Sequence, residues 1–455
     1  MAGACHILRS MRLSMIGCGY LGAVHAACMA ELGHDVVGLD VDSAKVELLS
    51  RGESPFHEPG FPELLKRNVD SGRLRFTTDP SAIADAEIHV IGVGTPQRQG
   101  RYAADMTYVY AAVETVLANA DTSGHTAVIA GKSTVPVGTA AQLADMAAES
   151  GKDIIVAWNP EFLREGFAVQ DTLHPDRLVY GLPDDVVAGT KAQAMLDQCY
   201  ETILAEGTPR LLANYPTAEL VKVAANSFLA TKISFINAMA ELCEATGADV
   251  TRLAEAIGHD DRIGKKFLRA GIGFGGGCLP KDIRAFMARA GELGVDQALT
   301  FLREVDAINL RRRERAIEIA SDIFGGRLVG RRVAVLGAAF KPDSDDLRDS
   351  PALDIATRLW ARGADVVITD PAANAGLRAA RPDLQVVDTI DEAVQDAEVV
   401  LVLTEWKEFV NLDPVALLAK VKSPHVIDGR HVLDPRTWAD AGWHYHGLGR
   451  GVSVW

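Results

Sequence analysis

The chain has 455 residues, of which 48% are hydrophobic and 24% charged, and its formal net charge at pH 7 is −15. These values are typical of a water-soluble globular protein long enough for two or three domains. The acidic balance argues against nucleic acid as a partner, and no run of about 18 apolar residues is present to span a membrane.

The six cysteines are scattered, with no CxxC pair and no Cys/His cluster at zinc-ligand spacing. We therefore expect a reducing, cytoplasmic location and no metal site. The first ten residues are too short and too weakly apolar for a signal peptide. Met11 is a candidate translation start because the first predicted strand follows directly, so residues 1–10 are expected to be an extension.

A βαβ unit with a glycine-rich turn is predicted at the start of the chain. A strand is expected over 12–16, followed by GCGYLG at 17–22, a helix over 23–32 and a second strand over 35–39 that ends at Asp40. Such glycines permit a tight turn and the approach of a pyrophosphate to a helix N-terminus, and the acid can bind a ribose hydroxyl. A carboxylate here should repel a 2′-phosphate. The pattern predicts NAD binding in preference to NADP; a glycine-rich turn without a ligand is the alternative.

Three further strands, expected at 87–94, 127–130 and 154–157, run into polar loops. In a doubly wound sheet such loops lie at the carboxyl edge, where ligands bind. Glu161 and Glu165 follow the third strand and are four residues apart, so a helical turn would place both on one face. They are either a functional pair or a solvated one.

The clearest long helix is expected over 216–247, with Thr217 as its N-cap and Gly247 as its end. Lys222 and Asn226 add polarity to one face of this apolar helix. Buried together they would stabilise an oxyanion, whereas on the surface they would form a solvated stripe. Their spacing alone leaves both interpretations open.

The stretch GIGFGGGCLPKD at 271–282 is the one around which the chain is organised. Its glycines favour a tight loop, and Pro280 suits the first turn of a helix. Cys278 is therefore expected just before a helix N-terminus, where partial positive charge lowers a thiol pKa. A reactive thiolate is the favoured interpretation, and an inert buried cysteine is the alternative.

A second long helical region is expected over 293–323, and its arginines at 311–313 are interpreted as a solvated or interface face. The following loop at 338–349 lacks GxGxxG, so it is not a second dinucleotide fingerprint, but its Lys341 and Arg348 could reach phosphates. Further elements are expected as strands at 331–337, 365–369, 399–403 and 425–427 and as a helix at 351–361 capped by Ser350.

This order of elements predicts an α/β protein with two Rossmann-like doubly wound domains joined by a central helical region that contains a long helix. We expect an N-terminal NAD-binding domain over 1–205 and a central helical domain with the cysteine loop and an interface over 206–325. A C-terminal Rossmann-like domain is expected over 326–455.

Together these motifs closely resemble the UDP-glucose 6-dehydrogenases of the UDP-glucose/GDP-mannose dehydrogenase family. The shared stretches run from Gly17 to Pro435 and are GCGYLG, VGTP, KSTVPVGT, NPEFLREG, ELVKVAAN, DDRIGKKFLRAGIGFGGGCLPKD, AFKPDSDDLRDSP, TEWKEF and DGRHVLDP. The resemblance implies NAD as cofactor, no metal, a C-terminal domain that binds the UDP-sugar, and a homodimer or larger homo-oligomer.

The family reaction oxidises the C6 alcohol of UDP-glucose to the carboxylate of UDP-glucuronate, a precursor for polysaccharide biosynthesis, with two NAD molecules per turnover. By this resemblance, Cys278 attacks the aldehyde that forms first. The resulting thiohemiacetal is oxidised to a thioester, which water hydrolyses.

The resemblance also implies individual site residues. The catalytic positions match Lys222 and Asn226 for the oxyanion, Asp282 and Thr134 with a shared water for proton transfer, and Glu161 as the base for hydrolysis. The cofactor positions match Gly17, Gly19, Tyr20, Leu21, Gly22, Asp40, Lys45, Thr95, Thr134, Glu165, Lys281 and Arg348. The substrate positions match Glu161, Phe162, Leu163, Glu165, Lys222, Asn226, Phe267, Phe274, Gly275, Phe340, Lys341, Arg430 and Arg262, the last reaching a neighbouring subunit's site.

Two alternatives stay open. A GDP-mannose 6-dehydrogenase shares GGxCLPKD and the four-electron chemistry, but RIG at 262–264 and DGRHVLD at 428–434 favour the uridine sugar. A catalytically silent NAD-binding thiol sensor would keep GCGYLG and Cys278 but would not need the other catalytic positions together.

Overall fold

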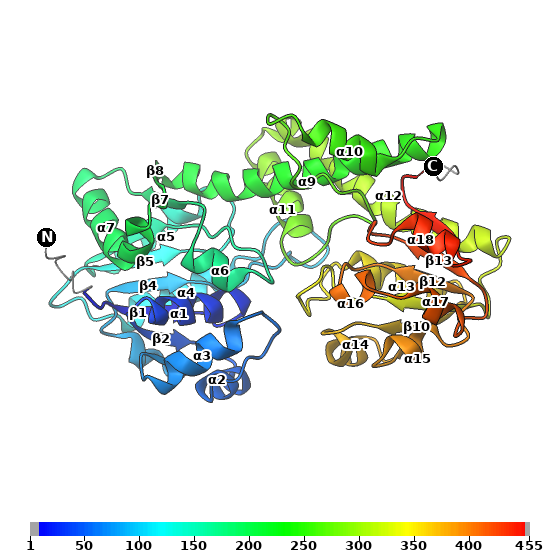
Figure 1. Cartoon of the computed structure of the whole chain (residues 1–455). Helices are drawn as coiled ribbons and strands as arrows, with labels where there is room; N and C mark the ends of the chain where they lie inside the picture. Colours follow the sequence, from blue (N-terminus) through cyan, green and yellow to red (C-terminus); the bar gives the residue numbers. More distant parts are fainter. Residues whose placement is uncertain (1–8, 451–455) are drawn as a thin grey trace, which may run out of the picture. The chain divides into compact units, whose positions relative to one another are not determined.

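The computed structural model describes residues 9–450 (Figure 1). The extension expected before Met11 falls mostly on residues 1–8, outside this part of the chain. Two compact units are present: unit 1 ends at Ala225 and unit 2 begins at Asn226. Among the described residues, no helix is long and apolar enough to cross a membrane.

Unit 1 contains an eight-stranded sheet in the order β3-β2-β1-β4-β5-β6-β7-β8. Its strands are β1 (Arg12–Ile16), β2 (Asp35–Leu39), β3 (Leu74–Thr77), β4 (Ile88–Ile91), β5 (Ala127–Gly131), β6 (Ile154–Trp158), β7 (Leu178–Leu182) and β8 (Arg210–Asn214). All neighbours are parallel except β6 and β7. The first six strands follow the order of doubly wound dinucleotide-binding sheets.

The helices of unit 1 are α1 (Tyr20–Glu31), α2 (Ser43–Ser50), α3 (Phe61–Asp70), α4 (Thr107–Asn119), α5 (Thr139–Glu149), α6 (Ala168–Leu173), α7 (Val186–Cys199) and α8 (Glu201–Ala205). A short 3₁₀ helix, η1 (Pro80–Ile83), precedes β4. The predicted first βαβ unit is confirmed, but α1 begins at Tyr20, three residues before the expected start at Ala23. Gly19 is its N-cap, so the helix opens directly on the glycine turn.

The long predicted helix is confirmed as α9 (Tyr215–Thr246). Its predicted N-cap is wrong, because Thr217 lies inside the first turn and donates its backbone N–H to the Asn214 side chain at 3.1 Å. Gly247 follows the last turn with a φ of 79°. A residue without a Cβ is favoured in that left-handed conformation, which ends the helix as expected.

Unit 2 contains a helical part, formed with the C-terminal part of α9, and a six-stranded parallel sheet in the order β11-β10-β9-β12-β13-β14. The helices are α10 (Val250–Gly258), α11 (Leu279–Glu292) and α12 (Thr300–Ile323), with the 3₁₀ helix η2 (Asp296–Leu299). The strands are β9 (Arg332–Leu336), β10 (Asp365–Thr369), β11 (Gln385–Val386), β12 (Val399–Val402), β13 (His425–Asp428) and β14 (His444–Gly447). The remaining helices are α13 (Pro351–Ala361), α14 (Asn374–Ala380), α15 (Ile390–Val394), α16 (Lys407–Val410), α17 (Pro414–Leu418) and α18 (Pro435–Asp440).

The sheet of unit 2 is buried on both faces. Along β9, Val333 and Val335 enter one core with α13, while Ala334 and Leu336 enter a second core with α16 and α18. This alternation follows from the two-residue period of a strand. A parallel sheet covered on both sides needs apolar residues in both registers, so the strand is a continuous apolar run. The predicted fold class, with two Rossmann-like sheets and a central helical region, is confirmed.

The interpretation of residues 311–313 as a solvated or interface face is wrong for two of the three arginines. Arg312 is fully buried and donates to Glu244 on α9 at 3.0 Å, and Arg313 is buried and donates to Asp349 at 2.8 Å. Only Arg311 is half exposed.

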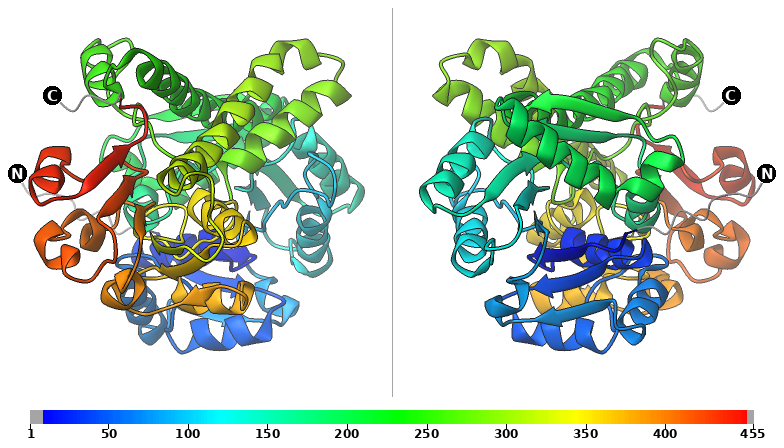
Figure 2. Two further views of the ribbon diagram at one scale, coloured as in Figure 1. Left: turned by 90° about the vertical axis from the view of Figure 1, so that its right-hand side faces the viewer. Right: turned by 90° about the vertical axis from the view of Figure 1, so that its left-hand side faces the viewer.

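Helix α12, which crosses the C-terminal part of α9 (Figure 2), begins seven residues later than expected, after Gly294 with a φ of 73°.

Replacement of Glu244 by alanine should lower the free energy of unfolding by about 3 kcal/mol, because the Arg312 guanidinium would be buried without its carboxylate. Chemical denaturation monitored by circular dichroism measures this. Glu241→Ala is the matched control on the same helix, since Glu241 pairs with the exposed Arg311. That pair should contribute less than about 1 kcal/mol. Equal effects of the two variants would contradict the importance of the buried pair.

Candidate functional site

The glycine turn before α1 has the geometry of a dinucleotide cradle. Gly17 has a φ of 89°, and a Cβ at Gly22 would lie 1.8 Å from the Gly17 carbonyl oxygen. A Cβ at Gly19 would meet nothing within 4 Å, so the space above the turn is open. The N-terminus of the twelve-residue α1 would offer a phosphate its first-turn N–H groups and a favourable dipole. These residues fit the pyrophosphate of a dinucleotide.

The acid at the end of β2 is held in place on two sides. Asp40 is buried and accepts the backbone N–H of Cys18 at 2.7 Å and the ammonium of Lys45 at 3.2 Å. The carboxylate therefore lies against the glycine turn itself, where a ribose hydroxyl would complete its hydrogen bonds. The structure brings together the predicted cofactor residues Asp40 and Lys45.

Three loops meet at the carboxyl edge because β4, β5 and β6 are neighbours in the sheet. The Thr95 hydroxyl donates to the Thr134 carbonyl oxygen at 2.8 Å, which joins the first two loops. In the third loop, Glu161 accepts the Leu163 N–H at 2.7 Å. The loop is irregular through 159–164, so a helical turn that would place Glu161 and Glu165 on one face is not present.

Lys222 and Asn226 are buried one turn apart on α9, and the alternative of a solvated stripe is wrong. The Lys222 ammonium bonds the Glu161 carboxylate at 2.7 Å. It also lies 5.7 Å from the centre of the Phe162 ring, within range of a cation–π interaction. Unit 1 thus assembles a lysine, a glutamate and an aromatic ring that sequence analysis drew from two separate motifs.

In unit 2, Cys278 is the N-cap residue of the fourteen-residue α11 and is exposed. This confirms its predicted place before a helix N-terminus and excludes the buried inert cysteine. The buried Asp282 accepts the side-chain N–H of Asn226 at 2.7 Å and pairs with Lys281 at 2.6 Å. A thiol, an amide and a carboxylate are therefore positioned by α9 and α11.

The glycine loop before Cys278 is held by α12. The Asn309 side chain accepts the Phe274 N–H at 2.7 Å and donates to the Phe274 carbonyl at 2.9 Å. Gly273 has a φ of 95°, and a Cβ there would lie 2.4 Å from the Asn309 amide oxygen. The glycine is needed for both the conformation and the close approach.

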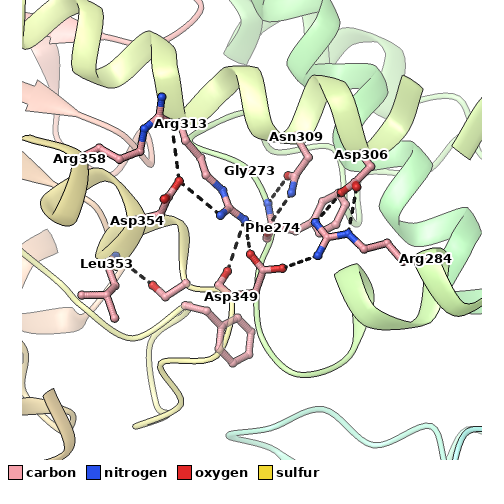
Figure 3. Close-up of polar contacts among 12 residues, drawn as sticks. Gly273, Phe274, Arg284, Asp306, Asn309, Arg313, Asp349, Leu353, Asp354 and Arg358 are labelled. Atoms are coloured by element: carbon pink, nitrogen blue, oxygen red, sulfur yellow. Dashed lines mark hydrogen bonds and ion pairs between the residues drawn. The ribbon is translucent and has the colours of Figure 1, made fainter. Parts of the chain in front are cut away.

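A charged network surrounds the same loop (Figure 3). Asp349 accepts from Arg313 at 2.8 Å and from Arg284 at 3.1 Å, and Arg284 also pairs with Asp306 at 3.0 Å. A Cβ at Gly275 would lie 2.3 Å from the Asp349 carbonyl oxygen. The network therefore fixes the 338–349 loop against the cysteine loop.

Several predicted ligand residues gather around the cysteine loop in unit 2. A Cβ at Gly277 would lie 2.5 Å from the Arg348 guanidinium carbon, and one at Gly276 would lie 2.8 Å from the Phe340 ring. Arg430 donates to the Gly273 carbonyl at 2.9 Å and to Leu403 at 3.0 Å. Arg430 thus binds the loop's backbone, a structural role that sequence analysis did not predict.

The structure also places three further residues that were predicted to bind substrate. Arg262 is 89% exposed and pairs with Asp260 of its own turn at 2.6 Å. Phe267 is partly exposed and has a φ of 64°. The Lys341 ammonium lies 5.1 Å from the centre of the Phe340 ring.

Sequence analysis missed two buried glutamates that bind the edge loops of unit 1. Glu219 accepts the N–H groups of Gly138 and Ala140, each at 2.7 Å, and so holds the loop that contains Thr134. Glu58 accepts the N–H groups of Gly166 and Ala168, where the loop that carries Glu161 ends. Glu219 stands at the start of ELVKVAAN, and its charge on an apolar helix was the signal that could have identified it. The segment around Glu58 contains no comparable signal.

Lys132, the first residue of KSTVPVGT, was also missed. Its ammonium is buried, donates to the Asn159 amide oxygen at 2.9 Å, and lies 5.4 Å from the centre of the Tyr200 ring. Burial lowers the pKa of Lys132 from 10.5 to about 8. The contact links the ends of β5 and β6.

The glycine turn, the anchored Asp40 and the strand order define unit 1 as the dinucleotide-binding domain of a dehydrogenase. The chain belongs to the UDP-glucose/GDP-mannose dehydrogenase family. It matches that family's NAD binding domain over residues 11–204, its central domain over 216–311 and its UDP binding domain over 334–435. It is an NAD-dependent oxidoreductase.

The similarity to individual relatives extends over nearly the whole chain. A UDP-glucose 6-dehydrogenase of Rhizobium meliloti is 40% identical over 97% of this chain and 100% of its own length. One of Pseudomonas aeruginosa is 41% identical over 97% of this chain and 98% of its own. The solved structure of a UDP-glucose dehydrogenase from Pyrobaculum islandicum superimposes with a TM-score of 0.89 at 37% identity, covering 98% of this chain and 99% of its own.

The depressed pKa of Lys132 predicts a pH-dependent contribution to stability. Between about pH 8 and pH 10.5 the unfolded chain binds a proton that the folded chain has released, so this contribution rises with pH. The stability of wild type relative to Lys132→Met should therefore increase between pH 7 and pH 9.5 in parallel denaturation experiments. A difference independent of pH would contradict the assigned shift.

Proposed function

We propose that this chain catalyses the NAD-dependent, four-electron oxidation of UDP-glucose to UDP-glucuronate. The observation that carries the proposal is the exposed Cys278 at the N-terminus of α11, beside the buried Asn226 and Asp282. A simple alcohol dehydrogenase needs no such thiol, whereas oxidation of an aldehyde to an acid can proceed through a covalent thiol adduct.

The relatives support the choice of sugar nucleotide. Those from Rhizobium meliloti and Pseudomonas aeruginosa are named UDP-glucose 6-dehydrogenases, and the matching C-terminal domain is described as UDP binding. The RIG and DGRHVLD segments favour the same substrate over GDP-mannose. UDP-glucose is therefore the proposed substrate, and the cofactor and substrate residues that the resemblance implies stay predictions.

The proposed reaction has three chemical stages. NAD, when bound, would supply the hydride acceptor for each of the two oxidations. Removal of a hydride and a proton from the C6 alcohol gives an aldehyde. The Cys278 thiolate then forms a carbon–sulfur bond to the aldehyde carbon while the carbonyl π pair moves to oxygen, which takes up a proton to give the thiohemiacetal hydroxyl. Loss of a second hydride and the hydroxyl proton gives a thioester, and water displaces the thiol to leave the carboxylate.

The residues of unit 1 supply charge stabilisation and a base. The Lys222 ammonium, buried beside Glu161, would attract the negative oxygen that develops in each stage. Glu161 would accept a proton from the water that attacks the thioester. Thr134 would hold a water for proton transfer, since its loop is fixed through Thr95 and Glu219.

The residues of unit 2 supply the nucleophile and its support. The helix N-terminus at Cys278 favours a thiolate over a thiol. Asn226 would donate to the oxyanion, and its bond to Asp282 fixes the amide in one orientation. Asp282 would receive and return the thiol proton.

We further propose a homodimer and a cytoplasmic location. Phe228, Phe235 and Leu242 are exposed at intervals of seven residues and so form an apolar stripe along α9. A second copy of the chain would cover this stripe. The five cysteines among the described residues are all free, as expected of a reducing compartment.

The substrate proposal is tested by counting NADH formed per sugar nucleotide consumed, with UDP-glucose and GDP-mannose assayed in parallel. Two NADH per UDP-glucose and little reaction with GDP-mannose are expected. Preference for GDP-mannose would replace the substrate and keep the chemistry. No turnover of either would favour the thiol sensor or another sugar nucleotide.

Cys278→Ser should abolish the complete oxidation, because a hydroxyl at this helix N-terminus is a far weaker nucleophile than a thiolate. NAD affinity, measured by protein fluorescence, should stay within about twofold of wild type because the glycine turn is unchanged. Formation of two NADH per UDP-glucose at the wild-type rate would rule out the covalent route.

Phe235→Asp should convert the dimer to a monomer in analytical ultracentrifugation, since a buried charge at the centre of the stripe would be unpaired. Val415→Asp is the control, because Val415 is exposed on α17, away from the stripe. A dimer that tolerates the aspartate at 235 would exclude the stripe as the interface.

A further inference from the structure

Glu58 lies in the segment between α2 and α3, and only 2% of it is exposed. One carboxylate oxygen accepts the Ala168 N–H at 2.7 Å, and the other accepts the Gly166 N–H at 2.6 Å. The second oxygen also accepts the Tyr20 hydroxyl, whose own oxygen accepts the Gly166 N–H at 3.0 Å. One buried side chain therefore bonds two segments that are distant in sequence.

Each of these segments belongs to the machinery described above. Tyr20 is the first residue of α1 and part of the glycine turn GCGYLG. Gly166 directly follows Glu165 at the end of the irregular loop that carries Glu161. Glu58 thus connects the dinucleotide cradle to the loop with the proposed base.

The contacts of Glu58 are stabilised by the protonation state of Tyr20 and by shielding from water. Burial, followed by the hydrogen bond to Glu58, raises the pKa of Tyr20 above its ordinary range, so the phenol stays protonated and remains a donor. The Phe56 ring packs 4.8 Å from the Tyr20 ring and shields the group from water. A carboxylate that satisfies three donors in a dry setting is costly to displace.

We propose that Glu58 is a positioning residue that couples the glycine turn to the 159–166 loop, so that nucleotide binding orders the segment carrying Glu161 and Glu165. A pyrophosphate on the N-terminus of α1 restrains Tyr20, Tyr20 restrains Glu58, and Glu58 restrains the N–H groups of Gly166 and Ala168. The proposal rests on the proposed function only through NAD binding, not through the identity of the sugar.

Amide hydrogen exchange of the full chain, with and without NAD and without a sugar nucleotide, tests this coupling. In wild type, NAD should slow exchange at 17–22 and also at 166–168, the latter by about tenfold. In Tyr20→Phe and Glu58→Gln, NAD should still protect 17–22, but its effect at 166–168 should fall below about twofold.

The two variants separate coupling from mere structural support. Tyr20→Phe keeps the bonds from Glu58 to Gly166 and Ala168 and removes only the second acceptor of the Gly166 N–H. Exchange at Ala168 without NAD should therefore match wild type, and this variant decides the matter if Glu58→Gln does not fold. Glu398→Gln is the matched control, because Glu398 is a buried glutamate of unit 2 that accepts the Arg332 N–H. It should respond to NAD as wild type does.

Equal NAD-induced protection at 166–168 in wild type and Tyr20→Phe would overturn the proposal, as would no effect of NAD at 166–168 in wild type. An enzyme that oxidised a different sugar nucleotide would give the same exchange result. Failure of the coupling and failure of the substrate assignment are thus told apart.

Discussion

A buried lysine needs a partner for its charge, and Lys222 has one in Glu161 at 2.7 Å. Breaking such a pair leaves an uncompensated charge in a dry setting, at a cost of several kcal/mol. The pair therefore fixes α9 to the loop after β6. Asn226 follows Lys222 by one turn of the same helix.

The cysteine loop depends on a different constraint, the absence of side chains. Asn309 and the Asp349 carbonyl oxygen lie so close to Gly273 and Gly275 that any Cβ would collide with them. Since Asn309 bonds the Phe274 backbone in both directions, the loop has one conformation and delivers Cys278 to the first turn of α11. The glycines serve rigidity here, not flexibility.

Local patterns in the sequence predicted the elements that depend on local physics. The strand at 35–39, the stop at Gly247 and the helix after Cys278 follow from apolar periodicity, a positive φ and a proline in the first turn. The glycine turn and its acid lie within one βαβ unit, so their spacing in sequence fixes their spacing in the fold.

Contacts between residues that are distant in sequence were harder to predict. Arg312 is buried because Glu244, on another helix, compensates it, and no pattern near residue 312 indicates that partner. The partners of Glu161 are Lys222 on α9 and the Leu163 backbone, and the spacing of Glu161 from Glu165 indicated neither of them. The role of Glu58 could not be predicted from local sequence for the same reason, since its partners lie about 40 and 110 residues away along the chain.

The central claim is a covalent bond between Cys278 and the substrate carbon. Intact-protein mass spectrometry of Glu161→Gln, mixed with UDP-glucose and NAD, tests it most directly because loss of the base should stall hydrolysis. The account predicts an added mass equal to UDP-glucuronate less one water, located on the peptide that contains Cys278 and absent from Glu161→Gln/Cys278→Ser. Turnover of Glu161→Gln with no adduct, or an adduct that persists without Cys278, would contradict it.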